Sequence, residues 1–189
     1  MAKKNNAKNA SIARPKIGGA VFAAPVGTAL PDSATAELND AFVCLGCLSE
    51  DGYSIETESD SEDLKDSDGD VMDVSSSKRT ETVSMAFLEV MNPDVLKVVY
   101  GDDVAVDDAT GAISFPHGKE PADRSYVCDS ILKGNRIDRL VLPQGRISEM
   151  DTVAFKKGEL KTLPVTIKAI SDEEGNPSYE YISGTTAAA

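Results

Sequence analysis

The sequence predicts a mainly β protein, namely a β-sandwich or barrel with one short flanking α-helix and a long acidic loop. Three observations support this fold class. Short segments in which apolar and polar residues alternate recur along the chain, as in half-buried strands. Only 92–101 has the start, apolar stripe and stop of a helix. The acidic stretch between two alternating segments carries too much charge to be core.

Length and composition limit the classes of protein that fit. The 189 residues have the size of one domain, and 41% hydrophobic with 5% aromatic residues predict a thin core. The formal net charge of −13 argues against ordinary nucleic-acid binding, which needs clustered Lys and Arg. No apolar run reaches the roughly 20 residues that span a bilayer, and no signal-peptide segment is present. We therefore expect a protein made in the cytoplasm, without a membrane partner.

The chain divides into three parts. Residues 1–16 contain basic but no acidic residues and predict a flexible N-terminal arm. Residues 17–182 are the predicted β-domain, with the acidic loop at about 56–78, and 183–189 are a predicted flexible tail. The basic residues of the arm are Lys3, Lys4, Lys8, Arg14 and Lys16.

The elements before the acidic loop are short. Apolar residues at 20–24 predict a strand that ends in a Pro and Gly turn. A helical turn is expected at 34–38. The apolar run 41–48 is broken by Gly46, which is consistent with a buried strand that carries a bulge.

Two alternating segments flank the acidic loop. Residues 52–58 place Tyr53 and Ile55 on one face and Glu56 and Glu58 on the other. Residues 80–89 alternate in the same way. A long hairpin with the acidic loop at its tip explains both segments, although its register does not follow from the pattern.

The helix and a series of strands follow. Asn92 is a suitable N-cap, Pro93 suits the first helical position, and Gly101 is a suitable stop, so a short amphipathic helix should close one edge of the sheet. A weak hairpin is expected around 107–111, and residues 133–135 form a predicted turn. Because Pro164 lacks a donor, it indicates an edge strand or a strand start. Further strands are predicted at 113–115, 125–129, 135–142, 155–160, 163–170 and 179–182.

Two of the three cysteines have the spacing of a reactive pair, but they lack the structural surroundings that such a pair needs. Cys44 and Cys47 match a redox pair, but such a pair needs a helix N-terminus and these lie in a predicted strand. A zinc site would need Cys128 and His117 from unrelated segments. We therefore expect buried structural thiols, with a small thiol oxidoreductase as the alternative.

The remaining motifs indicate neither catalysis nor a cofactor. Residues 66–70 (DSDGD) resemble the opening of a calcium loop, but Val71 stands where Gly is needed and Ser77 where Glu is needed. A calcium-stabilised adhesion or decoration protein is a third alternative. His117 is the only histidine, and no nucleophile elbow accompanies it. We expect no enzyme activity, no metal and no other cofactor.

The order of several segments resembles the major tail tube protein of long-tailed, non-contractile (siphovirus-type) bacteriophages. These segments are 19–31 (GAVFAAPVGTALP), 45–52 (LGCLSEDG) and 91–101 (MNPDVLKVVYG), followed by 155–160 and 163–167. The resemblance implies a tail tube fold that forms hexameric rings, which stack into a hollow tube in the virion tail. It also implies assembly in the host cytoplasm with tape measure, tail terminator and tip proteins. A type VI secretion tube protein is the nearest alternative.

The resemblance implies that the acidic loop reaches a neighbouring subunit or ring, and that the N-terminal arm clasps another copy. A negatively charged lumen would let DNA slide through without binding it. Candidate contact residues in the arm are the five basic residues named above. Those in the loop are Glu56, Glu58, Asp60, Glu62, Asp63, Asp66, Asp68 and Asp70.

Overall fold

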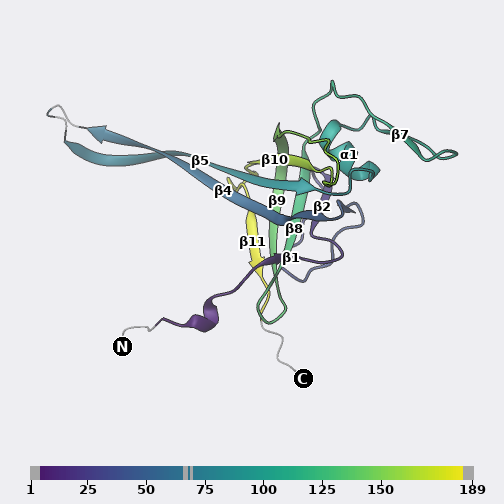
Figure 1. Cartoon of the computed structure of the whole chain (residues 1–189). Helices are drawn as coiled ribbons and strands as arrows, with labels where there is room; N and C mark the ends of the chain where they lie inside the picture. Colours follow the sequence, from purple (N-terminus) through teal and green to yellow (C-terminus); the bar gives the residue numbers. More distant parts are fainter. Residues whose placement is uncertain (1–4, 66–67, 69, 185–189) are drawn as a thin grey trace.

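One curled antiparallel sheet dominates the fold (Figure 1). The computed structural model describes residues 5–65, 68 and 70–184. Its main sheet has the strand order β3-β2-β8-β9-β10-β5-β4, with β1 beside β8 and β11 beside β9. In chain order the elements are η1 (Ala7–Asn9), β1 (Arg14–Pro15), β2 (Val21–Pro25), β3 (Val43–Cys44), β4 (Leu48–Lys65), β5 (Val71–Phe87), α1 (Pro93–Tyr100), β6 (Ala105–Asp107), β7 (Ala112–Ser114), β8 (Arg124–Leu132), β9 (Arg136–Met150), β10 (Leu163–Ile170) and β11 (Tyr179–Ile182).

The predicted mainly β fold with one α-helix is confirmed. Strands β10 and β11 have the bounds that alternation predicts, and helix α1 begins after the predicted cap. The Asn92 side chain accepts a hydrogen bond of 3.0 Å from the backbone N–H of Asp94, and Pro93 takes the first helical position. Gly101 ends the helix with φ of 98°, and its N–H donates to the Lys97 carbonyl.

The sheet curls around its main core. Val21 of β2, Val83 of β5 and Ile167 of β10 all have 0% exposure and belong to one apolar cluster. Helix α1 adds Val95 and Val98 to the same cluster, so it covers the core rather than an edge strand. Strands from both halves of the strand order therefore share a single interior.

A second, smaller cluster covers the opposite face of the central strands. It contains Ala24, Phe42, Val127 and Val141, with partly buried tyrosines of β11 packed against it. Residues 125–130 of β8 are consequently buried without interruption, because both faces of this strand are covered.

Three local predictions are wrong. The run 41–48 does not form one buried strand, because only Val43–Cys44 is strand in this run before β4 and both residues are exposed. Residues 155–160 form part of the loop between β9 and β10 rather than a strand, and Phe155 and Leu160 are 80% and 78% exposed. No neighbouring strand is available there to bury their side chains. Residues 34–38 contain a turn with a hydrogen bond from the Ala36 N–H to the Ser33 carbonyl instead of a helical turn.

Of the two alternatives for Pro164, a strand start is confirmed and an edge strand is not. Pro164 lies near the start of β10, and β10 lies between β9 and β5 rather than at an edge of the sheet.

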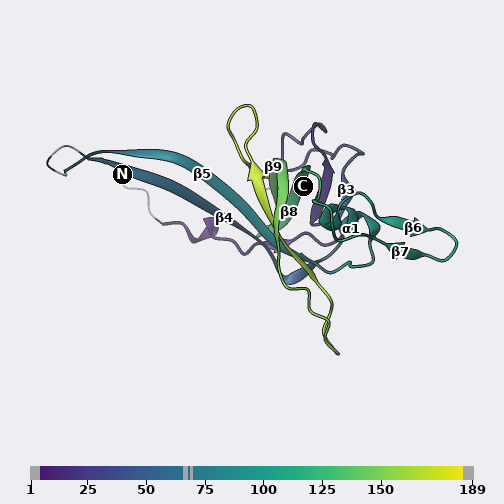
Figure 2. The same cartoon turned by 90° about the horizontal axis from the view of Figure 1, so that it is seen from above.

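The acidic segment is more regular than a solvated loop. Strand β4 continues to Lys65 and β5 starts at Val71, so paired strands replace most of the predicted loop. Glu56, Glu58 and Asp60 stand opposite Thr82, Thr80 and Lys78, respectively. Because no two carboxylates directly oppose each other at these positions, the backbone ladder forms despite the charge density. The resulting hairpin projects far beyond the rest of the sheet (Figures 1 and 2).

A buried ion pair holds the central strands and a loop together. Arg139 Nε and Nη2 donate to the two carboxylate oxygens of Asp129 at 2.7 and 3.0 Å. Arg139 Nη1 also donates to the carbonyls of Ser33 and Ala36 at 3.2 and 2.7 Å. Asp129 has 0% and Arg139 4% exposure, so neither charge is solvated and each depends on these partners.

We predict that Arg139→Met lowers the free energy of unfolding of the subunit by about 3 kcal/mol, because it leaves the Asp129 carboxylate buried with one weaker partner, Lys16. Urea unfolding followed by circular dichroism measures this. Lys97→Met is the matched control, since Lys97 pairs with Asp94 on the helix surface and its loss should cost less than about 0.5 kcal/mol. Equal losses in the two variants would contradict the assigned role of the buried pair.

Candidate functional site

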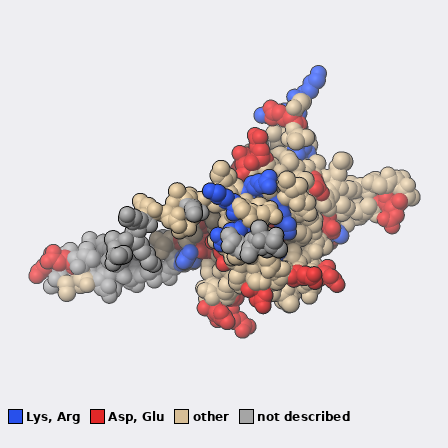
Figure 3. Space-filling view, turned by 90° about the horizontal axis from the view of Figure 1, so that it is seen from below, with Lys and Arg blue, Asp and Glu red and all other residues tan. Residues whose placement is uncertain are grey.

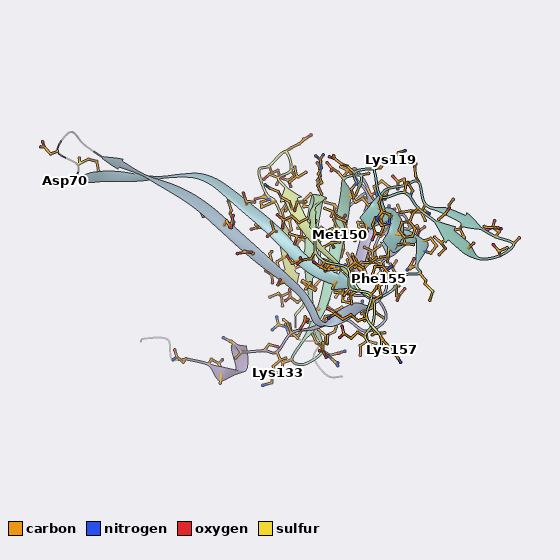
Figure 4. All side chains as sticks on the ribbon, turned by 45° about the horizontal axis from the view of Figure 1, so that its top comes forward. Asp70, Lys119, Lys133, Met150, Phe155 and Lys157 are labelled. Atoms are coloured by element: carbon orange, nitrogen blue, oxygen red, sulfur yellow. The ribbon has the colours of Figure 1, made fainter. Side chains whose placement is uncertain are left out.

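The projecting hairpin gathers the acidic residues predicted to make contacts. Glu56 and Glu58 are exposed on β4, and Asp68 and Asp70 are exposed near the tip, where Figure 4 labels Asp70. Asp66 lies outside the described residues. Three further residues predicted to make contacts lie within strand β4, namely Asp60, Glu62 and Asp63. The hairpin also exposes an apolar side chain, Met72, to 72%.

The hairpin has unpaired backbone edges. Strand β10 pairs with β5 only between Lys168↔Thr82 and Leu163↔Phe87. Within the described part of the chain, no strand other than β4 pairs with β5 beyond Thr82, and none pairs with the outer edge of β4. Such edges offer N–H and C=O groups to a neighbouring molecule, while the carboxylates oppose unspecific aggregation.

The predicted basic arm includes an ordered part that is tied to the sheet. Arg14 and Pro15 pair with Ile131 and Ser130 of β8 as strand β1. The Lys16 N–H donates to the Asp129 carbonyl at 3.0 Å, and Lys16 Nζ lies 3.4 Å from the Asp129 carboxylate. The charge of Lys16 is therefore partly used within its own subunit. Lys3 and Lys4 lie outside the described residues, and the side chain of Lys8 is not described.

Strand β1 also contacts the base of the acidic hairpin. Gly52 of β4 has φ of +68°, and a Cβ atom at this position would lie 2.9 Å from Pro15 Cγ. Tyr53 reaches under β1, and its hydroxyl lies 2.9 Å from Ser130 Oγ. Gly52 is required there for both the backbone angle and the close approach of Pro15.

Basic side chains gather on the underside of the molecule, where the N-terminal segment meets the β8–β9 turn (Figure 3). The turn is formed by Gly134 and Asn135, which both have positive φ. Arg136 donates from Nε to the Ser183 carbonyl at 2.7 Å. Arg14 and Lys133 are both exposed, and neither makes an ion pair within the described ranges.

The structure brings together two carboxyl groups that the sequence does not connect. Asp138 of β9 and Glu180 of β11 lie in a groove that Asp51 and Arg14 also line. Desolvation, followed by the charge of Glu180 and a hydrogen bond with it, raises the pKa of Asp138 to about 6. Since Asp138 and Glu180 are far apart in the chain and meet only because β11 pairs with β9, sequence spacing alone gives no sign of this pair.

The thiols differ from the prediction. Cys128 is buried as expected, but Cys44 and Cys47 are exposed, so the expectation of buried structural thiols is wrong for these two. The cause is the short edge strand β3, which ends at Cys44 and is followed by Gly46 with φ of +74°. Desolvation and the Glu89 carboxylate raise the pKa of Cys47, the opposite of the shift that activates a redox thiol.

His117 is part of an aromatic stack. Its ring centroid lies 4.6 Å from Tyr100 of α1 and 5.4 Å from Phe115. The stack ties the segment after β7 to the helix, which the sequence did not indicate because the rings come from separate segments. Among the described residues, no group of three His, Cys, Asp or Glu side chains is placed to hold a metal ion, and residues 66–70 fall mostly outside them. The described helices are too short and too polar to cross a membrane.

A family model described as phage tail tube protein matches residues 6–189, nearly the whole chain. The chain belongs to this family. A comparison with curated proteins found no match. The resemblance inferred from the order of short segments is thereby confirmed, and the chain is a structural tail tube protein of the virion tail.

The Asp138 pKa gives a pH-dependent prediction for the tail tube subunit. The pKa of Asp138 is higher in the folded subunit than in the unfolded chain, so folding favours the protonated carboxyl. The contribution of Asp138 to the free energy of unfolding is therefore complete below about pH 4 and is lost as the pH rises through about 6. Asp138→Asn should therefore raise the free energy of unfolding at pH 8 by about 1 kcal/mol, after allowance for solvent screening, and change it little at pH 4. Urea unfolding at both pH values measures the effect.

Asp123→Asn serves as the control of opposite sign. Hydrogen bonds from Arg146 lower the pKa of Asp123, so its contribution is present at pH 8 and is lost as the pH falls. This variant should be less stable than the wild type at pH 8. A loss of stability at pH 8 in Asp138→Asn as well would contradict the assigned effect of Glu180.

Proposed function

We propose that the chain self-assembles into hexameric rings that stack into the phage tail tube, a conduit for DNA ejected into the host. Membership of the tail tube family supports assembly into a tube. The observation that carries the finer proposal is the long acidic hairpin, which projects from the sheet with both outer edges unpaired in the described chain. A single copy gains nothing from this arrangement, whereas a neighbouring copy can pair with it.

The energetics of the hairpin favour a partner. A two-stranded ribbon is only marginally stable in water, and this one exposes Glu56, Glu58 and Met72. A neighbouring copy that supplies positive charge and backbone partners offsets both costs. Because the hairpin and its partner surface are different parts of the subunit, the contact is heterologous, and such contacts generate closed rings or open filaments.

We assign the hairpin acids and the N-terminal basic residues to contacts between subunits and rings. The hairpin set is Glu56, Glu58, Asp60, Glu62, Asp63, Asp66, Asp68 and Asp70, and the arm set is Lys3, Lys4, Lys8, Arg14 and Lys16. In the proposed assembly, the tape measure protein and the terminator and tip proteins are further partners, and assembly takes place in the host cytoplasm.

Charge accounts for passage of DNA in this proposal. The chain has a formal net charge of −13, so a tube of many copies is strongly anionic. Neutralisation of phosphates by Lys and Arg provides most of nonspecific DNA affinity, and an anionic wall lacks it. DNA then moves through the lumen without specific binding, and the tube acts passively.

We predict that purified subunit forms tubes visible by negative-stain electron microscopy, alone or with tail-assembly partners. The test variant replaces residues 59–79 with Asn-Gly, which joins the register partners Glu58 and Thr80 by a tight turn. It should unfold cooperatively like the wild type and form no tubes, because none of the described core residues lies in the removed segment. A wild type that stays monomeric in every condition would refute the proposal, and so would tubes formed equally well by the shortened variant.

A further inference from the structure

We infer that the acidic hairpin of one copy docks in a basic, apolar groove of a second copy, between the N-terminal segment and the β8–β9 turn. The inference rests on the proposed tube assembly and names the surface that receives the hairpin. The groove has a volume of about 680 Å³, within the range of roughly 300–1,000 Å³ usual for binding pockets. Its lining residues are Ala10, Ser11, Ile12, Arg14 and residues 131–135.

The walls of this groove are fixed by hydrogen bonds. One wall is the N-terminal segment, which is held by the pairing of Arg14 with Ile131 and by Ser11, whose Oγ accepts from the Lys133 N–H at 2.7 Å. The other wall is the end of β8 and the turn to β9. The groove is therefore a formed surface between two segments that are more than 100 residues apart in the chain.

The groove combines apolar area with two exposed basic residues, of which Arg14 also borders the groove of Asp51, Asp138 and Glu180. Ile12 is 86% exposed, and Ile131 and Leu132 line the groove beside it. Arg14 and Lys133 stand at its sides, and neither makes an ion pair inside the described chain. In a chain with 32 acidic and 19 basic residues, such a surface is suited to a ligand that is both acidic and apolar.

The hairpin has this combination of properties. Near its tip it carries the carboxylates of Asp68 and Asp70 and the 72% exposed side chain of Met72. Arg14 presents a planar guanidinium that pairs well with a carboxylate, and Ile12 offers apolar contact to Met72. In one copy, Asp70 lies at the far end of the hairpin while Lys133 lies on the underside beside the N-terminal segment (Figure 4). The hairpin of a second copy is therefore the occupant.

A competing basic surface fits less well. The loop between β9 and β10 carries Lys156, Lys157 and Lys161 and projects from the molecule (Figures 2 and 4). Lys156 pairs with Glu159 at 3.3 Å, and Lys161 lies 4.7 Å from the centroid of the Phe155 ring. Two of the three basic side chains thus have partners within the loop, which leaves this loop less suited to bind an acidic hairpin. Charge reversal in this loop therefore provides a matched control.

The test reverses charge on each side of the proposed contact. Arg14→Glu with Lys133→Glu should reduce the polymerised fraction in sedimentation by at least about tenfold, because like charges then face each other. Asp68→Lys with Asp70→Lys should have the same effect. The four substitutions together should restore tubes, whereas Lys157→Glu with Lys161→Glu should leave polymerisation unchanged. Urea unfolding of each soluble variant verifies that the subunit still folds.

A second measurement locates the contact directly. In a Cys44→Ser, Cys47→Ser background, Lys133→Cys with Asp70→Cys should give disulfide-linked oligomers only under conditions that form tubes. The inference is overturned if Arg14→Glu with Lys133→Glu polymerises like the wild type, or if its loss is not rescued and no cross-link forms. Rescue of Lys157→Glu with Lys161→Glu by the hairpin reversal would place the hairpin on the other loop. A wild type that forms no tubes would instead refute the proposed assembly itself.

Discussion

The register of β4 against β5 is the constraint on which the other features of this subunit depend. An acidic strand is stable only when its carboxylates face neutral or basic residues, and the pairing of Glu56 and Glu58 with Thr82 and Thr80 satisfies this condition. Since side chains alternate along a strand, a shift of β5 by one residue would also turn Val83, which is completely buried, out of the core and away from Ile167 of β10. The same register thus fixes the interior of the sheet and holds the projecting acidic surface in place.

The periodicity of the sequence predicted those elements that keep one face in the core along their whole length. Strand β10 has one face in the main core along its whole length, and α1 has a complete set of capping residues, so both were predicted with nearly correct bounds. The length of β4 and β5 was underestimated because charge density argues against a strand until the opposite residue is known. The exposure of Cys44 and Cys47 was missed because it also depends on neighbouring strands. They lie in or just after an edge strand of only two residues, which leaves both side chains exposed.

The candidate site was predictable only where it is continuous in the chain. Its carboxylates lie between two alternating segments, and the structure brings them onto one hairpin. The groove joins Ser11 to Lys133, and the carboxyl pair joins Asp138 to Glu180, so both depend on which strands are neighbours. Sequence spacing carries no information on such long-range pairs, and the buried contact between Asp129 and Arg139 was missed for the same reason.

Strand β1 has a mechanical consequence, because it touches two surfaces at once. Arg14 lines the groove on the underside, and the next residue, Pro15, presses on Gly52 at the root of the hairpin. In the proposed assembly, a hairpin bound in the groove of one subunit would therefore touch the same strand that supports the root of that subunit's own hairpin, so that the receiving and the projecting surface are linked through two adjacent residues.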